Sequence, residues 1–120
     1  MKTKDHLHKY RKFKEEGERS KYPPSKVENY FLSSFHLLEA FVYDKAGIHV
    51  QNHSKLRNIL EKNQFIFEDK TEKTWRKFQE LENRVRIATS YGKSESEEDA
   101  EKAKEIMEEI ESLCGDLDEL

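Results

Sequence analysis

The sequence predicts an all-α fold, an antiparallel up-and-down helical bundle of four principal helices plus one short helix. Apolar residues recur at spacings of three and four in several stretches, which is the period of an amphipathic helix. The two prolines and four glycines supply breaks between such stretches. Strict alternation of apolar and polar residues is rare, and no Asn-Gly or Asp-Gly hairpin dipeptide occurs, so strands are not expected.

The first two helices are predicted at about residues 3–20 and 25–46, on either side of Pro23 and Pro24. The first has only a weak apolar stripe. The second is apolar over much of its circumference, so we expect it to be the central helix. Its expected core residues are Val27, Tyr30, Phe31, Phe35, Leu37, Leu38, Phe41 and Val42.

Three more helices are predicted, a short one at about 52–63 and longer ones at about 69–91 and 95–114. The inward positions of the short helix are Leu56, Ile59 and Leu60. Those of the longer two are Trp75, Phe78, Leu81, Val85 and Ala88, then Ala100, Ala103, Met107, Ile110 and Leu113. A chain of 120 residues has one core, so residues 1–120 are expected to form a single domain.

Composition excludes several classes of protein. Charged residues make up 39% of the chain, but 11% aromatic residues argue against a disordered protein. The single cysteine, Cys114, cannot form an intramolecular disulfide and is interpreted as a small buried hydrophobic residue. No apolar run is long enough for a membrane span or a signal peptide. We therefore expect a cytoplasmic protein without a membrane partner.

The net charge of −3 conceals an asymmetry. Residues 95–120 contain twelve acidic residues and two lysines, a net −10, so residues 1–94 carry +7. The basic part could present a positive surface to phosphate groups, and the acidic last helix could dock on a basic partner.

Motifs for common chemistries are absent. The chain has no glycine-rich phosphate loop, no Cys-x-x-Cys pair and no nucleophile elbow, so we predict no cofactor. His49, His53 and Arg57 are spaced by four, a spacing at which two histidines of one helix can share a metal ion. Gly47 and Asn52 place His49 in a turn, however, so no metal site is predicted. His53 is expected to cap the third helix or to form a hydrogen bond where that helix starts.

Glu39 is an acidic residue in the apolar second helix. A buried carboxylate is seldom left unpaired, so Glu39 is expected to contact an arginine or a histidine. Arg84 and Arg86 of the fourth helix are candidates, and Arg57 is the partner that we assign as a structural pair.

Two stretches resemble a known group of proteins. "YFLSSFHLLEAFVYDKAGIHVQNHSKLRNIL" and the helix end "LENRVRIATSYG", followed by an acidic helix, resemble the HEPN superfamily over about residues 25–112. The resemblance implies a five-helix bundle that forms symmetric homodimers. It also implies relationship to metal-independent RNases that often pair with a minimal nucleotidyltransferase as toxin and antitoxin. Their site is an arginine followed, after four to six residues, by a histidine at the dimer cleft.

This chain departs from that motif, because no histidine follows Arg84 and Arg86 and Tyr91 stands in its place. A tyrosine, with a reference pKa near 10, is a poor general base at neutral pH. Arg84 and Arg86 are about 200° apart around a helix, so the two side chains cannot point the same way. In the structural interpretation of these residues, one arginine pairs with Glu39 or Glu82 and holds the bundle together, and Tyr91 packs as an aromatic residue at the helix end.

The resemblance therefore leads us to expect a non-catalytic, dimeric HEPN-like module. It would bind RNA, a nucleotide or a partner protein such as a nucleotidyltransferase through Arg84, Arg86 and Tyr91. One alternative is a metal-independent RNase toxin that uses Arg86 with Tyr91 or with His53. A second alternative is a helical protein-interaction module whose acidic last helix is the docking surface.

Overall fold

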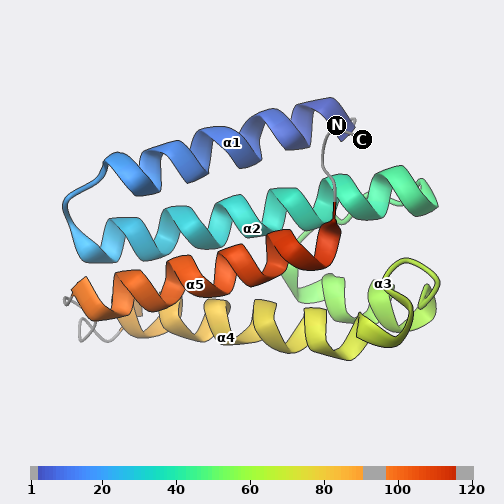
Figure 1. The fold of residues 1–120 in the computed structure, drawn as a ribbon. Helices are drawn as coiled ribbons and strands as arrows, with labels where there is room; N and C mark the ends of the chain where they lie inside the picture. Colours follow the sequence, from blue (N-terminus) through green and yellow to red (C-terminus); the bar gives the residue numbers. More distant parts are fainter. Residues whose placement is uncertain (1–2, 91–96, 116–120) are drawn as a thin grey trace.

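A computed structural model describes residues 3–90 and 97–115, with side chains up to residue 85 and again from residue 97. These residues contain helices and no strand, which confirms the all-α class (Figure 1). The long helices are α1 (Thr3–Arg19), α2 (Pro23–Ala46), α4 (Thr71–Ser90) and α5 (Glu97–Cys114). A 3-10 turn, His53–Lys55, leads into the short α3 (Leu56–Lys62), and a second, Glu68–Lys70, leads into α4.

Helix α2 begins and ends at residues suited to those positions. Pro23 and Pro24 occupy its first positions, where the missing backbone N–H is not needed by the helix. Gly47 ends the helix in the left-handed conformation, with φ of 67°, and its N–H donates to the carbonyl of Tyr43. A residue with a β-carbon is strained there, so glycine makes a clean stop.

Helix α2 is central, as its apolar circumference predicts. It packs against α1 on one side and against α4 and α5 on the other, while α3 packs on α4 (Figure 1). Successive long helices alternate in direction, but α2 contacts all three of the others (Figure 1). Its broad apolar surface is thereby covered by three neighbours.

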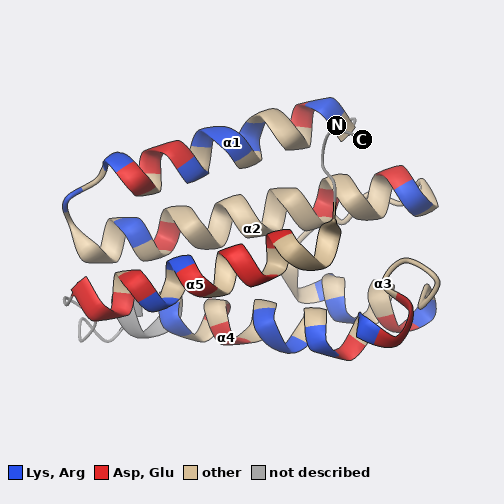
Figure 2. Cartoon of the chain, viewed as in Figure 1, with Lys and Arg blue, Asp and Glu red and all other residues tan. Residues whose placement is uncertain are grey.

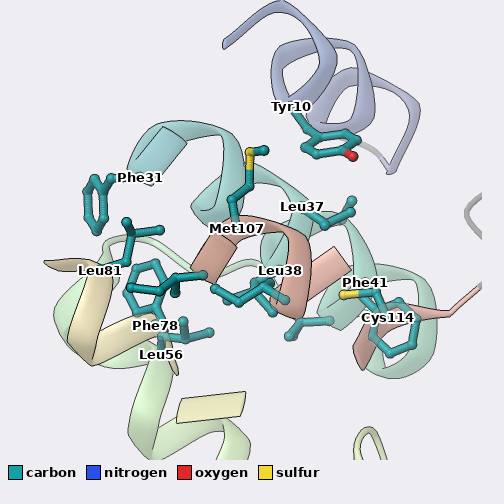
Figure 3. Packing of buried hydrophobic residues seen from close by; sticks show 14 of the residues in the cluster. Tyr10, Phe31, Leu37, Leu38, Phe41, Leu56, Phe78, Leu81, Met107 and Cys114 are labelled. Carbon is teal, nitrogen blue, oxygen red and sulfur yellow. The ribbon is translucent and has the colours of Figure 1, made fainter. Parts of the chain in front are cut away.

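The core lies where α2, α3, α4 and α5 meet. Leu37 and Leu38 of α2 pack with Phe78 and Leu81 of α4 and Met107 of α5 (Figure 3). Cys114 is buried, as expected for a small hydrophobic residue, and burial raises the pKa of its thiol to about 12.

Few large apolar side chains remain on the surface. In residues 3–85 and 97–115, Tyr22 and Phe65 are the large hydrophobic residues that are well exposed. Among the described helices, none has both the length and the apolar composition that crossing a membrane requires.

Candidate functional site

Arg84 is engaged within the bundle. Its guanidinium Nη1 donates to Asp99 of α5 at 3.3 Å, and the arginine side chain is about a quarter exposed. A surface groove of about 440 Å³ beside it is lined mainly by acidic residues, including Glu98, Glu101 and Glu105. The local charge is therefore unfavourable for phosphate, and Arg84 serves to join α4 to α5.

The structure describes less of the two other residues of the motif, Arg86 and Tyr91. Residue 86 belongs to α4, but its side chain and all of Tyr91 lie outside the described residues. Residues four apart on a helix share a face, so residue 86 is on the face of α4 that carries Glu82. Residue 84 is on a different face, as the predicted angle of about 200° between the two arginines requires.

His53 lies against that same face of α4. Its Nδ1 is in hydrogen-bonding contact with Oε2 of Glu82, although the two residues are 29 positions apart. The imidazole is about half exposed, and Phe31 and Phe35 meet it edge to face, with ring centroids 5.6 and 6.1 Å away. The predicted hydrogen-bonding role of His53 at the start of the third helix is thus confirmed, with Glu82 as the partner.

A carboxylate contact of this kind has a chemical consequence. With Nδ1 directed at Glu82, Nε2 is the ring nitrogen left out of the contact. An adjacent carboxylate fixes the tautomer and orientation of an imidazole, and an oriented imidazole can act as a general base or acid. The sequence alone could not show this pair, because nothing in the local spacing relates residue 53 to residue 82.

Arg57 lies elsewhere. Its Nε donates to Glu61 at 2.8 Å, and its guanidinium lies 5.7 Å from the ring centroid of Trp75. Arg57 and Trp75 line a groove of about 480 Å³ together with Glu68, Asp69 and Glu72. Like the groove beside Arg84, this one is too acidic to attract phosphate.

Glu39 does not pair with Arg57, nor with Arg84, and this corrects the expectation. Its carboxylate meets two histidines instead, with Oε1 3.2 Å from Nδ1 of His36 and Oε2 3.7 Å from Nε2 of His6. The reason is the side of α2 on which Glu39 lies. Its contact with His6 places it on the side of α2 that faces α1, whereas α3 packs on α4 and α4 covers the other side of α2 (Figure 1). The more general expectation of an arginine or histidine partner is confirmed.

The three groups form a cluster between α1 and α2. His6 and Glu39 are buried, and His36 is nearly so, with 15% of its side chain exposed. Burial lowers the pKa of His36 to about 4, lowers that of His6, and raises that of Glu39 to about 7. Desolvation disfavours the charged form of each group, so burial shifts the histidines and the acid in opposite directions.

Sequence reasoning did not identify His6 as part of this cluster. His36 and Glu39 are three residues apart and so share a face of α2, which is a signal that the sequence contains. The packing of α1 on α2 decides which of the residues of α1 faces them.

Acidic residues recur along α5 (Figure 2), and their contacts and exposure divide them into two sets. Asp99, Glu109 and Glu111 contact basic residues of α4 or α1, namely Arg84, Lys77 and Lys14. The exposed acidic residues are Glu97, Glu98, Glu101, Glu105 and Glu108. The first set joins helices. The second set is therefore more available to a docking partner, although Glu105 also pairs with Lys102 of the same helix at 3.8 Å.

Comparison of the chain with protein-family models, with curated proteins and with solved structures found no significant match.

Proposed function

We propose that the protein is a non-catalytic HEPN-like module that binds phosphate groups of RNA or of a nucleotide. Its contact surface would be the face of α4 that carries Glu82 and residue 86, with His53 beside it. One observation carries the proposal. The His53–Glu82 contact sets an imidazole on the α4 face of residue 86, while Arg84 on another face is bound to Asp99.

The chemistry fits phosphate better on this face than in the grooves. Arginine binds a phosphate bidentately, and a protonated histidine adds a second donor. Glu82 is already in contact with His53, so part of its repulsion toward phosphate is offset by that partner. The resemblance to HEPN proteins implies that two copies form a dimer with this face at the cleft. It also implies a nucleotidyltransferase as a possible partner protein.

Binding can be measured by fluorescence anisotropy with labelled single-stranded RNA and with a labelled nucleotide, at several salt concentrations. Arg86→Ala should weaken binding severalfold and reduce the salt slope by about 1, because one phosphate contact is lost. The matched control is Arg76→Ala, which removes the same charge from an exposed position of α4. Equal weakening by both variants, or no binding by the wild type at low salt, would overturn the proposal.

Metal-independent RNA cleavage is a second candidate, favoured specifically by the His53–Glu82 contact. An oriented imidazole could accept the proton of the ribose 2′-hydroxyl through Nε2 while Arg86 holds the phosphate. Tyr91 would then not be needed as the base.

The test is cleavage of mixed RNA by purified protein with and without a chelator. If the chain is an enzyme, His53→Ala should reduce the rate by about 10²-fold or more, the usual contribution of a general base. Glu82→Gln should give a smaller loss, whereas Arg76→Ala should leave the rate unchanged. Binding without cleavage would support the non-catalytic module, and cleavage that survives in His53→Ala would exclude His53 as the base.

A further inference from the structure

The cluster of His6, His36 and Glu39 lies apart from the α4 surface proposed to bind phosphate. His36 and Glu39 share one face of α2, and His6 reaches them from α1. The ring of Phe13 stacks on that of His36, with the centroids 5.5 Å apart and the planes 8° from parallel. The imidazole of His36 is thereby packed against α1.

Two distances within the cluster match the separation of ligand atoms around one metal ion. Nδ1 of His36 is 3.2 Å from Nδ1 of His6 and 3.2 Å from Oε1 of Glu39. One nitrogen or oxygen atom from each of the three residues lies within 4.8 Å of the others. Two ligand atoms of a tetrahedral zinc ion, each about 2.0–2.1 Å from the metal, are about 3.3 Å apart. Two of the three ligand separations therefore fit without movement of the helices.

Nδ1 of His36 is close to both other groups. It is in hydrogen-bonding contact with Nδ1 of His6, and it lies 3.2 Å from Oε1 of Glu39. A neutral imidazole offers a lone pair on one ring nitrogen, and a carboxylate offers lone pairs on both oxygens. A cation at the centre would meet one such lone pair from each of the three ligand atoms.

We propose that His6, His36 and Glu39 bind a divalent transition-metal ion of the zinc type between α1 and α2. Two imidazoles and one carboxylate suit zinc and its neighbours in the first transition series, whereas magnesium and calcium prefer oxygen ligands. Three protein ligands leave a fourth position for water or for another small ligand. Because its ligands come from two helices, the bound ion links α1 to the rest of the bundle.

This site does not depend on the proposed RNA-binding function, and the two proposals can fail separately. The first measurement is calorimetric titration of the metal-free chain with Zn²⁺, followed by thermal unfolding with and without Zn²⁺. We expect one ion per chain and a higher unfolding temperature, since the ion binds only the folded arrangement. Absence of binding by the wild type, with its fold verified by circular dichroism, would overturn the proposal.

The second measurement uses Co²⁺, whose visible absorption reports its geometry. A tetrahedral site with two imidazoles and a carboxylate should give intense d–d bands but no thiolate charge-transfer band. A thiolate band would contradict the ligand set, and an octahedral spectrum would contradict the tetrahedral geometry of a zinc-type site.

Substitutions then identify the ligands. His6→Gln, His36→Gln and Glu39→Gln should each weaken Zn²⁺ binding at least tenfold. His8→Gln is the matched control on α1, since His8 is exposed and two residues from His6. His49→Gln and His53→Gln control for ions held by the other histidines, and neither should change the affinity. If a control variant loses as much Zn²⁺ affinity as the ligand variants, or if all three ligand variants keep full affinity, the ion binds elsewhere.

Discussion

At the scale of single residues, Gly17 shows how closely α1 and α2 approach. A β-carbon at this position would lie 2.7 Å from Cε1 and 2.9 Å from Cδ1 of Tyr30, whose ring is buried. Such separations are far shorter than a van der Waals contact. Glycine is therefore needed here for space, although it weakens the interior of a helix.

Gly17→Ala should accordingly destabilise the protein. The gain in helix propensity of about 1 kcal/mol is smaller than the roughly 1–3 kcal/mol that overpacking costs. We expect a net loss of about 1 kcal/mol, measured by urea unfolding. In a Tyr30→Val background the ring is absent, so the same substitution should cost less. A stabilised Gly17→Ala protein would show that the two helices separate easily.

Individual residues also decide how the motif "RVRIATSYG" is interpreted. The sequence predicts that Arg84 and Arg86 point in different directions, but it does not say whether either arginine is structural. The contact between Arg84 and Asp99 assigns the structural role to Arg84. Arg86 therefore stays the arginine on which the proposal of phosphate binding rests.

At the scale of the helices, one carboxylate of α5 bonds to two side chains of α1. Glu111 accepts hydrogen bonds from the hydroxyl of Tyr10 and from Nζ of Lys14, the latter at 2.7 Å. The Tyr10 side chain is buried, so its hydroxyl depends on this partner. Burial, followed by the contact with Glu111, raises the pKa of Tyr10 and keeps its hydroxyl a donor.

We therefore expect Glu111→Gln to lower the free energy of unfolding by about 1 kcal/mol, the usual net contribution of such a hydrogen bond. The comparison is Glu108→Gln, the same change of charge at an exposed position of α5, which should stay within about 0.5 kcal/mol of the wild type. Chemical denaturation followed by circular dichroism measures both. Similar losses in the two variants would mean that general charge, and not this contact, governs the result.

The helices themselves are well predicted from the sequence. Each long helix begins and ends within a few residues of its expected position, because apolar spacing and the residues at the ends act over one or two turns. Two of the expected helices open with a 3-10 turn, at His53–Lys55 and at Glu68–Lys70. Such turns are common at helix ends and leave no strong mark in a sequence.

At the scale of the whole molecule, the chain covers most of its apolar surface by itself. A thin bundle with Trp75, several phenylalanines and a long fourth helix has more apolar surface than one small core easily covers, which favours burial against a second copy. The described part of the structure gives this argument little support, because α2 is enclosed by α1, α4 and α5. A homodimer therefore stays a proposal that rests on the resemblance to HEPN proteins.

We expect sedimentation velocity at micromolar concentration to show a dimer that dissociates on dilution. Arg86→Glu should weaken it if two copies meet at the proposed phosphate-binding face, whereas Arg76→Glu, at an exposed position on the same helix, should not. If the protein is a monomer at every concentration, it lacks the dimer that HEPN proteins form, and the resemblance loses that support.

The sequence by itself determined the helical class, the approximate ends of the helices and the central place of α2. These features depend on interactions between residues within a few positions of one another. Only the tertiary structure brought His53 to Glu82, Arg84 to Asp99, and His6 to His36 and Glu39. Such contacts depend on which turn of one helix faces which turn of another, and that register is set by the packing of whole helices. Both proposed sites of this protein arise at that level.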